Sequence, residues 1–227
     1  MLSLADGAEN FAVTCMPAAD PTGIVLFAVG GGGDPARHQP LLEYLSGQGL
    51  TVVAPHFERL AAPRATSDEL LLRARRLRLA LAVAERPYLP VTGIGHSIGA
   101  STLLGLAGGR MWLDASGPLP IERESRLARL AVLAPATGFF RAPGALGQID
   151  IPLLAIAASE DDVTPPAQTE FLRSELAGPM PVEMRIVQGA GHFSFMDQPP
   201  PDVIDPLPER EVFLAQLAID LAGFSKG

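Results

Sequence analysis

Short apolar runs alternate with helix-length spacers along most of the chain. Each run is four to seven residues long, which is typical of a strand buried on both faces of a parallel sheet. The six predicted strands are Gly23–Val29, Leu50–Ala54, Val91–Ile94, Leu130–Leu133, Leu153–Ala157 and Val182–Val187. The segment Asn10–Pro17 is a candidate edge strand. This alternation predicts an α/β fold with a doubly wound, mostly parallel sheet flanked by helices.

The spacers carry helix start and stop signals. Arg37–Gly47 has an apolar stripe and stops at a glycine. Thr66 followed by Glu69 forms a capping-box pattern, which begins a long helix running to about Glu85, before Pro87. This helix carries four arginines, Arg73, Arg75, Arg76 and Arg78, which we interpret as a face exposed to solvent. Further helices are predicted at Ile98–Leu106, Pro166–Leu176 and Glu209–Leu221.

Length and composition fit one domain. The 227 residues are 48% hydrophobic, enough for one sizeable core and few for two, so residues 1–227 are predicted to form a single domain. A formal net charge of −8 argues against a nucleic-acid partner, and the oligomeric state is left open. The first residues lack the pattern of a signal peptide and no apolar run reaches eighteen residues, which predicts a cytoplasmic protein without a membrane span. The only cysteine, Cys15, excludes an intramolecular disulfide and a Cys-rich metal site.

Candidate chemistry begins at Ser97, in the stretch VTGIGHSIGAS. This serine lies between a predicted strand and a predicted helix, with Gly95 and Gly99 two residues to either side. A nucleophile on such a tight turn needs a strained backbone, and the glycines let neighbouring segments pass close by. The first turn of the helix also offers free backbone N–H groups near the serine oxygen. The alternative is a serine that only caps the helix.

A serine hydroxyl becomes nucleophilic only when a base accepts its proton. The best-placed histidine is His192, in VQGAGHFSF, where a predicted strand ends in a glycine-rich turn. Because the carboxyl ends of parallel strands meet at one edge of the sheet, His192 and Ser97 are expected to lie together. His96 adjoins the serine but points to the opposite face of the strand. His38 and His56 are interpreted as structural or solvated.

An acid that orients the histidine is expected at another strand end. Glu160, Asp161 and Asp162 directly follow the predicted strand Leu153–Ala157. They are also compatible with a solvated acidic turn or a helix cap. Any of them completes the chain order serine, acid, histidine that this type of fold uses.

These segments together resemble the α/β-hydrolase fold family, in particular its small bacterial dienelactone-hydrolase-like and esterase-like members. The likeness spans nearly the whole chain, from GIVLFAVGGGG through GHSIG and SEDDVTPP to GAGHFSF. It implies that Ser97 is the nucleophile and His192 the general base. The family acid stands in the motif D-x-x-x-P, which fits Asp161 and Pro165 better than Asp162. The implied chemistry needs no metal and no organic cofactor.

The first glycine loop departs from the family pattern. The family usually has His-Gly there, where this chain has Val29 followed by four glycines. The resemblance implies that the N–H groups of Gly31, with Gly30 as alternative, and of Ile98 form the oxyanion hole. A phosphate-binding loop is the rival interpretation, but no Gly-Lys-Ser/Thr or G-x-G-x-x-G pattern accompanies it. Dienelactone hydrolase itself has a cysteine at the position of Ser97, and the dehalogenases of the family need an aspartate there.

The prediction is therefore a serine hydrolase that cleaves a carboxylic ester of a small or short-chain substrate through an acyl-enzyme. Phe139, Phe140 and Phe193 are the predicted substrate-binding residues. Only about twenty residues separate Leu133 from Leu153, too few for a large cap domain, so a shallow site is expected. The alternatives are a non-catalytic binding protein, and an acyltransferase or perhydrolase with the same triad.

Overall fold

The strands of the protein form one eight-stranded sheet in a computed structural model, which describes residues 1–61, 65–84, 86, 88–176 and 182–227. The strand order is β1-β2-β4-β3-β5-β6-β7-β8. The strands are β1 (Leu2–Asp6), β2 (Glu9–Met16), β3 (Gly23–Ala28), β4 (Leu50–Pro55), β5 (Val91–His96), β6 (Leu127–Leu133), β7 (Leu153–Ala158) and β8 (Val182–Val187). β2 pairs antiparallel with both β1 and β4, and all the other neighbouring strands pair parallel. The predicted doubly wound α/β fold with a mostly parallel sheet is confirmed.

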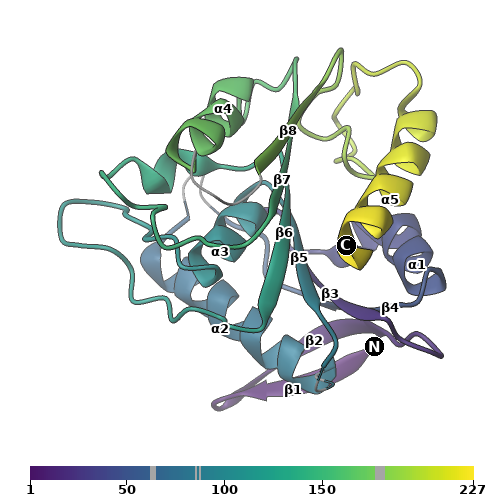
Figure 1. The fold of residues 1–227 in the computed structure, drawn as a ribbon, viewed down its shortest axis with the longest axis horizontal. Coiled ribbons are helices and arrows are strands. Elements are labelled where there is room, and N and C mark those ends of the chain that lie inside the picture. The colour runs from purple at the N-terminus through teal and green to yellow at the C-terminus, as the bar shows by residue number, and fades with distance from the viewer. Residues whose placement is uncertain (62–64, 85, 87, 177–181) are drawn as a thin grey trace.

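Helices cover both faces of the sheet (Figure 1). α1 (Gln39–Gly47) and α5 (Arg210–Lys226) lie on one face, and α2 (Ser67–Ala84), α3 (Ile98–Leu106) and α4 (Pro166–Glu175) lie on the other. Strand β3 serves both layers, since Leu26 packs toward α2 and α3 while Phe27 packs toward α1. Such alternation is expected for a pleated strand with helices on both sides, and it explains why every residue of β3, β5 and β7 is buried.

All six predicted strands and the candidate edge strand are present, with ends within three residues of their predicted positions. The capping box of α2 is also present, because the Thr66 N–H donates to Glu69 Oε2 at 2.7 Å and the Glu69 N–H donates to Thr66 Oγ1 at 3.3 Å. The predicted end of that helix at Glu85 lies outside the described residues. α5 continues beyond the predicted Leu221 to Lys226.

The N-terminal hairpin changes the interpretation of the α2 arginines. Strand β1 has no apolar run and most of it is exposed, so the hydrophobic pattern did not predict it. Its last residue, Asp6, accepts hydrogen bonds from Arg75 and Arg76. Arg76 is thereby buried, and Arg73 is buried under the end of β3. The expected solvated face is therefore wrong for Arg73 and Arg76, because elements distant in sequence cover it.

Two of the connections at the carboxyl ends of the strands contain a turn of 3-10 helix. Between β6 and β7 the described chain contains one turn of 3-10 helix, Thr137–Phe140, and no inserted cap domain. A second 3-10 turn, Pro35–His38, joins the first glycine loop to α1. Within the described residues, no helix combines the length and the hydropathy needed to cross a bilayer.

Candidate active site

Ser97 forms a sharp turn between a strand and a helix. β5 ends at His96 and α3 begins at Ile98, so Ser97 alone connects them. Its φ of 56° and ψ of −123° lie in a region that side-chain-bearing residues rarely adopt. The Ser97 side chain makes no capping hydrogen bond to α3, so the helix-cap interpretation fails. The strained turn leaves the hydroxyl available for other partners.

The two flanking glycines permit this turn. A Cβ on Gly95 would lie 2.7 Å from the Ala100 nitrogen, and a Cβ on Gly99 would lie 2.1 Å from the Ala28 carbonyl oxygen. Real Cβ atoms do not approach backbone atoms so closely. The glycines thus allow the start of α3 to pack directly against β5 and the end of β3, as the sequence pattern predicted.

His192 lies between Ser97 and Asp161. Its Nε2 is 3.1 Å from Ser97 Oγ, and its Nδ1 is 2.8 Å from Asp161 Oδ2. Because a carboxylate only accepts, the Nδ1–H donates to Asp161 and leaves Nε2 to accept the Ser97 proton. Both side chains are buried. The three residues, drawn from the ends of β5, β7 and β8, therefore form one continuous line of hydrogen bonds.

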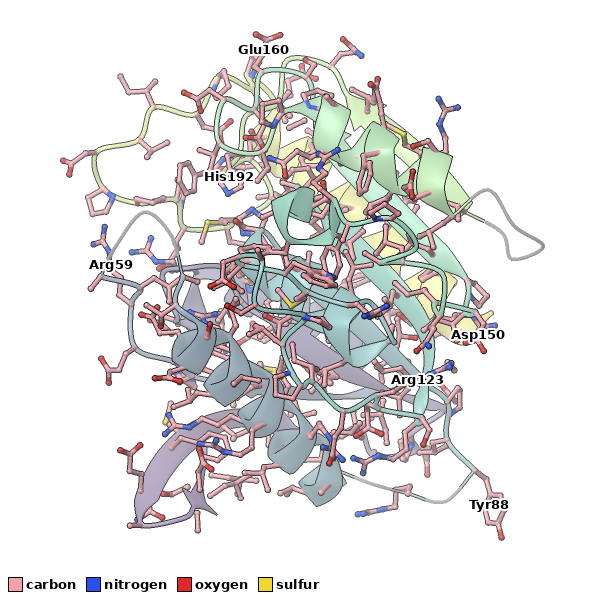
Figure 2. All side chains as sticks on the ribbon, turned by 90° about the vertical axis from the view of Figure 1, so that its left-hand side faces the viewer. Arg59, Tyr88, Arg123, Asp150, Glu160 and His192 are labelled. Carbon is pink, nitrogen blue, oxygen red and sulfur yellow. The ribbon has the colours of Figure 1, made fainter. Side chains whose placement is uncertain are left out.

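The structure distinguishes Asp161 from the neighbouring acids. Asp162 is exposed, and Glu160 is also exposed and projects from the outer edge of the molecule (Figure 2). Burial raises the pKa of Asp161, but the hydrogen bond and charge of His192, together with the amide and hydroxyl of Thr164, outweigh it and hold this pKa below its ordinary value. Asp161 is therefore ionised at neutral pH.

A turn of backbone holds the Asp161 carboxylate in place. Its Oδ1 accepts the N–H groups of Val163 and Thr164 at 2.8 and 2.7 Å. Thr164 Oγ1 lies 2.8 Å from Asp161 Oδ2 and 3.0 Å from His192 Nδ1. We did not identify Thr164 from the sequence, although its position three residues after the acid, inside D-x-x-x-P, was a usable signal.

The other histidines form no hydrogen bond with Ser97 in the described part of the chain. His96 Nε2 lies 2.9 Å from the His192 carbonyl oxygen, so this ring contacts the backbone of His192. Burial, with the charges of His192 and His38, lowers the pKa of His96 well below its ordinary value. His38 is fully buried, and burial lowers its pKa to about 4. His56 contacts Thr14 Oγ1 at 2.8 Å, on β2.

The first glycine loop lies against Ser97. A Cβ on Gly30 would come within 3.5 Å of the Ser97 Cβ, so the loop and the serine nearly touch. Gly31 and Ile98 line the same cavity as Ser97. Among the described residues, neither the Gly31 N–H nor the Ile98 N–H has a hydrogen-bond acceptor. Two donors without an acceptor among the described residues therefore line the same cavity as Ser97.

A cavity of about 1050 Å³ opens over Ser97 and His192. Phe139 and Phe193 line it as predicted, whereas Phe140 is 1% exposed and packs into the core beside Gly109. In Figure 2, His192 and Arg59, which also lines the cavity, lie on one flank, while Tyr88, which precedes β5, lies at the opposite end.

No group of three or more metal-ligating His, Cys, Asp or Glu side chains occurs among the described residues. Ser97, His192 and Asp161, which the sequence predicts as a triad, lie in this order, each within hydrogen-bond distance of the next. The two predicted amide donors, Gly31 and Ile98, line the same cavity.

Comparison with known proteins gives the fold a wider context. The chain matches no protein-family model and no curated protein sequence. A candidate α/β hydrolase from Agrobacterium tumefaciens superposes with a TM-score of 0.68 at 14% identity, over 97% of this chain and 94% of that one. The dienelactone hydrolase of Anabaena variabilis gives a TM-score of 0.68 at 20% identity, over 98% and 94% of the two chains. An esterase from Thermogutta terrifontis gives 0.64 at 18% identity, over 95% and 86%, and has been solved with propionate and with butyrate bound. The chain therefore has the α/β-hydrolase fold.

Proposed function

We propose that the protein is a serine hydrolase that cleaves a carboxylic ester of a small or short-chain substrate. The observation that carries this proposal is the continuous line from Ser97 Oγ through His192 to Asp161, built on a strained turn. A structural serine has no need of a strained backbone beside a buried histidine–carboxylate pair, whereas a nucleophile does.

The reaction starts with proton transfer and attack. His192 Nε2 accepts the Ser97 proton as the oxygen bonds to the ester carbonyl carbon. The carbonyl oxygen becomes an oxyanion, which the N–H groups of Gly31 and Ile98 stabilise. Asp161 stabilises the imidazolium that forms on His192. The tetrahedral intermediate then expels the alcohol, which takes the proton from His192.

Water completes the cycle. It attacks the Ser97 ester with His192 as base, and the second tetrahedral intermediate releases the carboxylic acid and the free serine. All the proton transfers use side chains of this chain, so the proposed reaction requires neither a metal nor an organic cofactor.

Two observations support the ester class and the substrate size. The fold neighbours include proteins named esterases, one of them with propionate and butyrate bound, and a dienelactone hydrolase. The cavity walls near Ser97 carry apolar side chains, among them Phe139, Phe193 and Met196, which suit a short acyl or alkyl group.

A fluorophosphonate probe tests the proposal, with p-nitrophenyl esters of rising chain length as the turnover assay. We expect one covalent adduct on Ser97 of the wild-type protein, none on Ser97→Ala, and the fastest turnover with short chains. An unlabelled wild-type protein, or labelling that persists in Ser97→Ala, would contradict the proposal. Added alcohol or peroxide that captures most of the acyl group would instead indicate an acyltransferase or perhydrolase.

A further inference from the structure

Arg73, on α2, is the largest fully buried side chain in the described part of the protein. Burying a cation is costly unless an anion pairs with it. Arg73 forms no ion pair with any described carboxylate, and burial lowers its pKa to about 10. One of its nitrogens, NH2, is buried without a hydrogen-bond partner. The proposed catalytic steps leave this buried cation without a role.

Two hydrogen bonds join Arg73 to the backbone at the start of the glycine loop. Its NH1 donates to the carbonyl oxygens of Val29 and Gly30 at 3.1 and 3.2 Å. The guanidinium also lies 4.6 Å from the centre of the Phe57 ring. Arg73 therefore holds the end of β3 between α2 and the segment that follows β4.

The geometry of the peptide bond relays this contact to the cavity. The Gly30 carbonyl and the Gly31 N–H belong to one peptide, and no described peptide bond is cis. In a trans peptide these two groups point in opposite directions. The Gly30 carbonyl also accepts the Gly33 N–H at 3.2 Å, so Arg73 and this turn together direct the Gly31 N–H away from the guanidinium. The Val29 carbonyl fixes the Gly30 N–H in the same way, so Arg73 orients whichever amide donates.

The positive charge of Arg73 should also strengthen the amide donors that its hydrogen bonds orient. A cationic donor polarises the carbonyl that accepts from it and makes the N–H of the same peptide a stronger donor. A buried positive charge near the loop also favours negative charge on a bound oxygen. That negative charge is present in the tetrahedral intermediate and absent from the bound ester. The effect should therefore fall on kcat more than on KM.

We propose that Arg73 is the positioning residue of the oxyanion hole, acting through the Val29–Gly30 and Gly30–Gly31 peptides. This inference rests on the proposed hydrolase function. It assigns a role to a residue that does not line the cavity.

Arg76 provides a matched control, because it is buried on the same helix but pairs with Asp6 and Glu9. We compare Arg73→Met, Arg73→Lys and Arg76→Met by kcat and KM for a p-nitrophenyl ester. Binding of an alkylboronic acid, which forms a tetrahedral adduct on serine, and thermal unfolding are measured in parallel. Removing one direct oxyanion donor costs about a hundredfold to a thousandfold in kcat, so we expect Arg73→Met to lose about tenfold to a hundredfold.

The expected pattern has three parts. Arg73→Met lowers kcat and weakens boronic acid binding by similar factors while KM stays within about twofold. Arg73→Lys, which keeps the charge and loses the planar fork, recovers part of both losses. Arg76→Met lowers the unfolding temperature and leaves kcat unchanged. If Arg73→Met does not fold, the Lys variant alone must still show the loss of kcat and of boronic acid affinity.

Two results would overturn the inference while the hydrolase function stands. The first is a fluorophosphonate-labelled, active wild-type protein whose Arg73 variants keep wild-type kcat. The second is Arg76→Met losing as much kcat as Arg73→Met, which would indicate a purely structural role. A wild-type protein that neither labels nor turns over ester overturns the proposed function and this inference with it.

Discussion

Side chains surround Ser97 on one side, and backbone amides surround it on the other. On one side, the side chains of His192, Asp161 and Thr164 contact one another within hydrogen-bond distance. On the other side, backbone amides border the cavity, and glycines and the buried Arg73 set their positions. A site made of side chains depends on the residue types at a few positions. A site made of backbone amides depends on the neighbouring residues that fix the conformation of the backbone.

Removing the base should have the largest effect on the side-chain half. His192→Ala leaves Ser97 without a proton acceptor, and we expect kcat for a p-nitrophenyl ester to fall by about ten-thousandfold to a millionfold. His56→Gln is the control, because His56 contacts Thr14 outside the cavity lining. Equal losses in the two variants would contradict the assignment of the base.

The adjacent acids give a sharper comparison within the same half. Asp161→Asn keeps the shape of the side chain but loses the charge that stabilises the imidazolium, so kcat should fall by about ten-thousandfold. Asp162→Asn changes an exposed neighbour and should stay within about twofold of wild type. The reverse order in steady-state assays would move the acid to Asp162.

For the backbone half, the substitution Gly99→Ala should destabilise the fold. A Cβ there would lie 2.1 Å from the Ala28 carbonyl oxygen, so α3 must move away from β3. We expect Gly99→Ala to lower the free energy of unfolding by at least about 3 kcal/mol. Gly223→Ala, in α5 with no atom within 4 Å of the new Cβ, should be neutral or stabilise by up to about 1 kcal/mol. Urea unfolding of both variants measures the difference, and similar stabilities would refute the close packing.

Acid should lower the free energy of unfolding through the buried His38. Burial lowers its pKa to about 4 in the folded protein, from an ordinary value of 6.5. The unfolded chain therefore binds the proton first as the pH falls, and stability is lost between about pH 6.5 and pH 4. From pH 7 to pH 5 this costs about 2 kcal/mol. His38→Leu should reduce the loss by that amount in urea unfolding, and an unchanged pH dependence would contradict the burial of a neutral imidazole.

The smallest expected effect comes from Thr164→Val. Valine keeps the shape and removes the hydroxyl that contacts Asp161 and His192. The loss of one hydrogen bond to a charged group predicts about a tenfold drop in kcat. The drop should appear in kcat with KM nearly unchanged. A variant with wild-type kcat would show that the turn amides alone hold the carboxylate.

The same contrast explains what could be predicted from the sequence. Ser97, His192 and the acidic turn were predicted because the sequence itself shows both their residue types and their positions directly after predicted strands. Arg73 was misread as solvated because the residues that bury it, Val29, Gly30 and Phe57, come from other segments.

Prediction of the fold has the same limit. β3, β5 and β7 were predicted because burial on both faces requires continuous apolar runs. β1 was missed because an exposed edge strand needs no such run. Phe139 and Phe140 are neighbours in one 3-10 turn, yet one faces the cavity and the other the core, a difference that only the packing of the turn determines.

The most direct test of the central claim is the intact mass of the protein, quenched with acid during turnover of p-nitrophenyl butyrate. If Ser97 is the nucleophile, wild-type protein gains the mass of one butyryl group, and peptide mapping places it on Ser97. Ser97→Ala gains none and has no turnover. Turnover without an acyl-serine, or an identical adduct on Ser97→Ala, would contradict the account.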